Sequence, residues 1–230
     1  MKKRLILLLI LSFTLAAALP AGDKAEFVNL GFSPDGRYFL FGQYGFNEEN
    51  SKSYAEIFLV DVEKNLFVSG GVFKGEYVSS LEPGQSTDGA LFTLMESVVS
   101  VKNKYSIDYL KKGRPLYIRI EETEESMESL DFRDFETGSH YLLDLNQDVK
   151  TDEDGAAVNS SFYIDLSYTS AAGKEVPFSI GHPDYRRNDI SQYRIERVIT
   201  DPVGHSVVIV LAKIDKDLNV RYMVETLKIQ

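Results

Sequence analysis

Residues 32–45 have the sequence FSPDGRYFLFGQYG, in which a tight-turn motif leads directly into an aromatic-rich apolar run. Pro34 sets a backbone angle that suits the turn, and Asp35 follows it. Gly36 belongs there because such turns commonly need a positive φ, which glycine adopts without steric cost. The run at 37–44 then predicts a buried strand. The stretch therefore indicates a β fold built from hairpins.

Short apolar or alternating runs, separated by turn residues, continue along the rest of the chain. They predict strands at 27–32, 54–62, 66–73, 116–120, 141–145, 162–168, 176–180, 193–200, 206–214 and 220–229. Loops are expected at 47–53, 121–128, 152–161 and 171–174. Because no Pro/Ser-rich linker interrupts this pattern, we expect residues 22–230 to form one mainly β domain of short antiparallel strands.

Residues 87–105 depart from the β pattern. Apolar side chains recur there at i, i+3, i+4 and i+7 spacing, at Leu91, Leu94, Met95, Val98 and Tyr105. Ser86 or Thr87 can cap the start. The spacing predicts one amphipathic helix at about 88–104, packed on the sheet. Two short strands are the alternative, because the segment is also rich in β-branched valines.

A second stretch, TDPVGHSVVIVLAK at 200–213, is similar to the opening one. Pro202 and Gly204 match Pro34 and Gly36 at one common offset, although Asp35 corresponds to Val203. The two units, at about 27–62 and 193–229, resemble blade repeats of the TolB-type β-propeller. The resemblance implies a propeller-like fold, and a sandwich-like fold is the alternative. Similar terminal units also suggest that their strands pair in one sheet.

A wider resemblance involves the segments GFSPDGRYFLFGQYG, YAEIFLVDV and EPGQSTDGALFTL. Together they are similar to a bacterial family of predicted secreted proteins of unknown function. This resemblance implies export and a β-rich domain. It implies no activity and no functional residues.

The N-terminal region has the three parts of a secretory signal peptide. Lys2, Lys3 and Arg4 precede an apolar run at 5–19, and small residues follow, so cleavage after Ala18 or Ala21 is expected. The run is shorter than the roughly 20 residues that span a bilayer, so no membrane span should remain after processing. Because the chain has no cysteine, neither a lipoprotein anchor nor a disulfide is expected. We predict a signal peptide at 1–21 and a periplasmic or secreted protein.

Charge restricts the classes of partner. The chain has 25 basic and 35 acidic residues, a net charge of −10. Removal of the three basic residues at 2–4 leaves 22 against 35, or −13. A strongly negative surface disfavours nucleic acid and anionic lipid, and is compatible with cationic partners or divalent ions.

Few patterns point to chemistry. The sequence contains no Gly-x-Ser-x-Gly motif and no His-Glu-x-x-His motif. Asp148, Asp152 and Asp154 precede Gly155 and are calcium candidates, although neither register of the EF-hand template fits them. A solvated hairpin loop is the alternative. The histidines, His140, His182 and His205, lie far apart in the sequence.

The segment at 181–189 is the candidate binding surface. It concentrates Tyr185, Arg186 and Arg187, residue types that anchor interfaces, in an acidic protein. The alternative is a structural loop whose arginines pair with nearby acidic residues.

The sequence favours a non-catalytic binding or scaffolding module of the cell envelope, with an envelope protein as its partner. No catalytic residue, metal ligand set or cofactor site is assigned. One alternative is an exported hydrolase that uses a carboxylate pair on a glycan or peptide. The other is a calcium-stabilised structural module.

Overall fold

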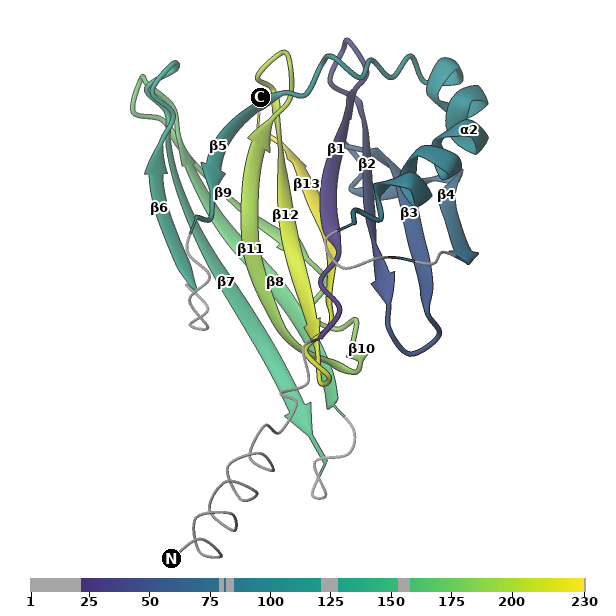
Figure 1. Ribbon diagram of the computed structural model, residues 1–230. Coiled ribbons are helices and arrows are strands. Elements are labelled where there is room, and N and C mark those ends of the chain that lie inside the picture. Colours follow the sequence, from purple (N-terminus) through teal and green to yellow (C-terminus); the bar gives the residue numbers. More distant parts are fainter. Residues whose placement is uncertain (1–21, 79–80, 82–84, 121–127, 153–157, 230) are drawn as a thin grey trace, which may run out of the picture.

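A computed structural model describes residues 22–78, 81, 85–120, 128–152 and 158–229, which form three antiparallel sheets and one helix (Figure 1). The N-terminal sheet has the order β1 (Glu26–Phe32), β2 (Tyr38–Asn47), β3 (Lys52–Asp61) and β4 (Leu66–Val78). The central sheet has the order β13 (Val220–Lys228), β12 (Ser206–Asp215), β11 (Ile190–Thr200) and β5 (Arg114–Ile118). The third sheet has the order β10 (Arg187–Asn188), β8 (Val158–Thr169), β7 (His140–Thr151) and β6 (Ser129–Arg133), and β9 (Glu175–Gly181) also pairs with β8.

The central sheet lies between the other two sheets (Figure 1). Alternate residues of β12 show this directly, because successive side chains of a strand point to opposite faces. Val207, Ile209 and Leu211 join the core of the third sheet, whereas Val208 and Val210 join the core of the N-terminal sheet. Burial on both faces explains why β12 is an almost continuous apolar run.

Helix α2 (Asp88–Lys104) covers the outer face of the N-terminal sheet (Figure 1). Leu91, Leu94 and Val98 are buried against Leu40 and Ile57. The prediction of one packed amphipathic helix is confirmed, and the alternative of two strands is wrong.

The mainly β prediction is also confirmed, but several boundaries are wrong. β6 and the two-residue β10 were not predicted, and residues 158–161, which were expected in a loop, begin β8. The polar start of β8 is stable in the interior because the Ser160 hydroxyl lies 3.0 Å from the Tyr193 hydroxyl. The predicted signal peptide and most of the 121–128 loop lie outside the described residues.

The two similar units adopt the same turn. Gly36 has a φ of 74° and Gly204 a φ of 75°. Each glycine N–H donates to the carbonyl three residues earlier, of Ser33 at 2.9 Å and of Asp201 at 3.2 Å. The turns also touch, since a Cβ at Gly36 would lie 2.7 Å from Asp201 Oδ2.

The expectation that the two units pair within one sheet is wrong. β2 lies between β1 and β3, and β12 lies between β11 and β13, so each unit forms three adjacent strands of a different sheet. The sheets then pack face to face, and the described residues form no closed propeller. A shorter link does join distant parts of the chain: Lys24 forms a parallel bridge to Val220, and the Ala25 N–H donates to the Val220 carbonyl at 3.0 Å.

Side chains of the N-terminal sheet cap the open edge of β13. The Tyr222 N–H donates to Gln43 Oε1 at 2.6 Å, and the Thr226 N–H donates to Asn65 Oδ1 at 2.8 Å. An uncapped edge strand can pair with another chain. These two amides therefore attach β13 to the neighbouring sheet and block strand addition along most of its length.

A partly buried ion pair connects the central and third sheets. Arg114, at the start of β5, donates two hydrogen bonds of 2.6 and 2.7 Å to the Asp134 carboxylate. Asp134 is buried in the turn after β6 and also accepts from the Thr137 hydroxyl at 2.7 Å. The hydrogen bonds from Arg114, with those from Thr137 and the backbone, hold the pKa of Asp134 well below its ordinary value.

We expect Asp134→Asn to lower the free energy of unfolding by about 2 kcal/mol at pH 7, because it removes a charge-assisted bidentate contact. The native pKa is depressed, so the stabilisation is present above the unfolded pKa of about 4 and is lost as the pH falls through the native pKa. Urea melts between pH 2 and 7 should therefore show the deficit of the variant shrinking in acid.

Glu63→Gln is the matched control, because its partner Lys228 is half-exposed and such surface pairs contribute little. A constant deficit for Asp134→Asn across the whole pH range would contradict the role of this ion pair.

Candidate functional site

A hollow of about 240 Å³ lies beside β13, where all three sheets contribute residues. β13 supplies Met223 and Glu225, and the turn between β3 and β4 supplies Asn65. Phe67 of β4 is 51% exposed and forms an apolar wall. The lining is mostly apolar with a few converging polar groups, the usual composition of a ligand site.

The apolar wall continues a row of aromatic rings across the N-terminal sheet. The Phe67 ring stacks on Phe58 with centroids 5.3 Å apart, Phe58 stacks on Phe41 at 5.0 Å, and Phe41 stacks on Phe27 at 5.8 Å. Cross-strand aromatic pairs stabilise a sheet beyond the area they bury. Phe67 is therefore held in place by the core although half of it is exposed.

Another wall comes from β10 and the segment before it, which contain the predicted binding residues. His182, Tyr185 and Arg187 line the hollow, and Tyr185 is 61% exposed. Arg186 does not line it, and instead pairs with the Asp148 carboxylate of β7. Of the two adjacent arginines, Arg186 therefore pairs with an acid and Arg187 lines the hollow.

Aromatic rings surround the guanidinium of Arg187. Its Cζ lies 4.9 Å from the ring centre of Tyr185, 5.0 Å from that of Phe162 and 5.8 Å from that of Tyr193. Nη1 is buried without a hydrogen-bond partner, and no side-chain N–H of Arg187 donates to an acceptor among the described residues. The side chain is therefore oriented by rings, and its guanidinium makes no hydrogen bond to the described residues.

Glu225 gives the hollow a buried carboxyl group. It is 4% exposed, and its Oε2 accepts a short hydrogen bond from the Asn65 side chain. Burial raises the pKa of Glu225, and the Asn65 hydrogen bond and the nearby Arg187 and His182 partly oppose the rise. Perturbed carboxyl groups beside a hollow are typical of functional sites.

We expect Glu225→Gln to flatten the pH dependence of stability. Because the native pKa is raised, stability is present below the unfolded pKa of about 4 and is lost as the pH rises through the native pKa. Glutamine keeps the shape without ionising, so the variant should gain stability relative to the parent between pH 4 and 8. Parallel stability curves in thermal melts over this range would contradict this prediction.

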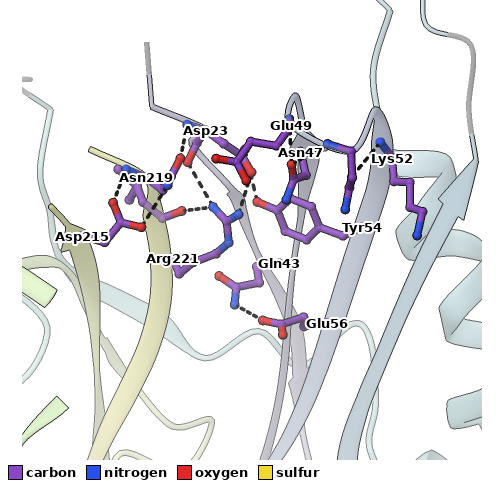
Figure 2. Close-up of polar contacts among 12 residues, drawn as sticks. Asp23, Gln43, Asn47, Glu49, Lys52, Tyr54, Glu56, Asp215, Asn219 and Arg221 are labelled. Carbon is purple, nitrogen blue, oxygen red and sulfur yellow. Dashed lines mark hydrogen bonds and ion pairs between the residues drawn. The ribbon is translucent and has the colours of Figure 1, made fainter. Parts of the chain in front are cut away.

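A second hollow, of about 300 Å³, is polar and lies between β3, β4 and β13. Figure 2 shows its central contacts. Arg221 pairs with the Asp23 carboxylate at 2.6 Å and lies over the Tyr54 ring at 4.3 Å. The backbone N–H of Asp23 also donates to Asn219 Oδ1 at 2.8 Å.

The charges of this polar hollow pair with one another. Lys74 lies 2.5 Å from Glu56, and Lys52 lies 2.9 Å from Glu76. The network fastens residues 23–25 to β13, which is a structural role. The hydrolase alternative needs two carboxyl groups in one hollow. In the polar hollow, Glu56 and Glu76 are both ion-paired with lysines. In the apolar hollow, Glu225 is the one carboxyl group among the described lining residues.

The calcium candidates do not form a cluster in the described part of the chain. Asp148 pairs with Arg186 and lies 3.9 Å from Lys150, Asp152 follows the end of β7, and Asp154 lies outside the described residues. No group of three acidic or histidine side chains suited to a metal occurs among the described residues. His140 instead contacts Asp131 at 2.5 Å.

The chain matches the family model described as "Predicted secreted protein (DUF2259)" over residues 40–228. It belongs to this family. The predicted family resemblance is confirmed, whereas nothing supports the propeller resemblance beyond the shared turn. A search of curated proteins found no match to the chain.

The DUF2259 match covers the whole apolar hollow, from Val60 to Glu225, and begins after β1 and the Ser33–Gly36 turn. Within the described residues, no helix of this family member has the length and apolar character needed to cross a membrane. The description of the DUF2259 family as predicted secreted proteins agrees with the expected export, and the three sheets confirm the β-rich fold.

Sequence reasoning identified one wall of the hollow in this DUF2259 chain and missed the other. Tyr185 and Arg187 were predicted, whereas Glu225, Asn65 and Phe67 were not. One signal was present: Glu225 interrupts the apolar pattern of the last strand, YMVETLKI, at a position that the fold buries. A buried acid in a strand needs a partner or a function.

Proposed function

We propose that this protein is a non-catalytic binding module of the cell envelope, periplasmic or secreted, and that the apolar hollow beside β13 receives an envelope protein. One observation carries the proposal. A partly exposed apolar wall faces a guanidinium that has no hydrogen-bond partner among the described residues. Exposed apolar surface next to Tyr and Arg side chains is characteristic of interface anchors.

Site-specific photo-cross-linking tests the proposal. A photoreactive residue at Tyr185 reports on the hollow, and the same residue at Phe135, which is 98% exposed in the turn after β6, is the matched control. The tagged full chain is exported in its own cells, and captured proteins are identified. We expect one recurrent envelope protein from Tyr185 that is missing from Phe135.

The captured protein must then bind in purified form. Phe67→Asp places a charge on the apolar wall and should weaken that binding by about tenfold or more. Phe92→Asp, on a comparably exposed phenylalanine of α2, should leave binding unchanged. The same captured proteins from both probe positions, or equal binding by both variants, would refute the proposal.

A further inference from the structure

The unpaired cation of Arg187 indicates which chemical group the hollow accepts. This chain has an excess of acidic residues, yet no acid lies within ion-pair distance of Arg187 among the described residues. Glu225 is the nearest acid in the hollow, and it is bonded to Asn65 instead. A guanidinium offers five donors in a planar fork, so the group that completes this site is an anion.

The surroundings favour a carboxylate among the anions. The guanidinium fork matches the two oxygens of a carboxylate, which it binds bidentately. A dianionic phosphate would lie beside the carboxyl group of Glu225 and would lose its hydration shell against Phe67 and Met223. Charge repulsion and desolvation both disfavour its binding. A single charge attached to an apolar group suits the same walls.

The size and the backbone of the hollow indicate the rest of the ligand. Its volume of about 240 Å³ is below the roughly 300–1,000 Å³ of sites for drug-sized ligands, so it holds about one side chain. The N–H groups of Tyr222 and Thr226 point to the open edge of β13, and by strand alternation the N–H of Val224 does too. Val224 and Arg187 both line the hollow, so the edge-facing N–H of Val224 adds a backbone donor on the side of β13.

We infer that the hollow binds the C-terminal residue of a partner chain, with the terminal carboxylate on Arg187 and an apolar side chain against Phe67 and Met223. The inference rests on the proposed function and specifies the part of the partner that is recognised. Chain termini are captured in this way in other recognition modes, where backbone and cationic donors meet the carboxylate.

Calorimetric titration of the full mature protein with two matched peptides tests the inference. The first is Gly-Ser-Gly-Ser-Phe with a free carboxylate, and the second is the same peptide with a C-terminal amide. We expect the amide to bind about tenfold more weakly or worse, because it leaves a desolvated guanidinium unpaired. A third peptide that ends in glycine should also bind more weakly, because it lacks the apolar side chain.

Two neighbouring arginines supply the protein-side control. Arg187→Gln should abolish the preference for the free carboxylate, whereas Arg186→Gln, which breaks the surface pair with Asp148, should keep it. Circular dichroism melts establish that each variant is folded. If Arg187→Gln does not fold, the comparison of acid and amide peptides on the parent protein still decides the question.

Three outcomes would overturn the inference: equal binding of acid and amide, binding of neither, or binding of 3-phenylpropanoate as tight as that of the acid peptide. The last would show that the ligand is a free carboxylic acid. These failures differ from failure of the proposed function. Partner capture at Tyr185 without a preference for the free carboxylate would leave the binding module intact and would remove only the terminal-residue mode.

Discussion

Phe162→Ala is expected to lower the free energy of unfolding by about 3–5 kcal/mol, the usual cost of removing a large buried aromatic side chain. Phe162 is 1% exposed in the core between the third and central sheets, and its ring centre lies 4.5 Å from that of Tyr193. For a chain of this size, the midpoint of thermal unfolding should fall by about 10 °C. Differential scanning calorimetry of the variant and the parent protein measures this change in midpoint.

The same substitution should also weaken ligand binding, because Phe162 is one of the three rings around Arg187. Phe135→Ala is the control, since the Phe135 side chain is almost fully exposed. This substitution should change the free energy of unfolding by about 0.5 kcal/mol or less. A midpoint for Phe162→Ala within 2 °C of the parent, roughly the effect of 1 kcal/mol, would contradict the described packing.

Gly31→Ala is expected to cost about 3 kcal/mol or more, for two reasons that act together. Gly31 has a φ of 115°, which residues with a Cβ rarely adopt. A Cβ there would also lie 2.2 Å from the carbonyl oxygen of Asp108. That segment covers the edge of β1, where the Phe32 N–H donates to the Lys111 carbonyl at 2.8 Å. The substitution must therefore displace the cover of this edge.

Gly89→Ala is the matched control, because the same replacement of glycine by alanine should raise the free energy of unfolding there. Gly89 lies in the first turn of α2, and a Cβ there would meet nothing within 4 Å. Alanine reduces the backbone freedom of the unfolded chain and should stabilise the protein by about 0.5–1 kcal/mol. Chemical denaturation of both variants gives the two values, and equal effects would contradict the assigned backbone conformations.

The sequence predicted those parts of the fold in which local chemistry decides the structure. Gly36 and Gly204 stand in turns that need their positive φ, and the spacing from Leu91 to Val98 has the period of a helix face. β6 was missed because its sequence, SLDFR, carries two charges in five residues. The polar residues near the start of β8 suggested a loop, because Tyr193, the partner of the buried Ser160, lies 33 residues further along the chain.

The candidate site could be predicted only in part, for the same physical reason. Tyr185 and Arg187 are close in sequence, so the local composition was enough to predict them as binding residues. Glu225 and Asn65 are 160 residues apart and meet only because two sheets pack together. No local pattern specifies such a contact, and no local pattern distinguishes Arg186, which pairs with Asp148, from Arg187, which does not.

The bridge between Lys24 and Val220 has a consequence for the kinetics of folding. It joins residues 196 positions apart, and the central sheet takes three of its four strands from residues 190–228. The aromatic inner face of the N-terminal sheet therefore stays uncovered until β12 and β13 arrive. Non-local closure of this kind slows folding and prolongs the exposure of apolar surface. We expect a slow folder whose apolar surface stays exposed until its last strands dock.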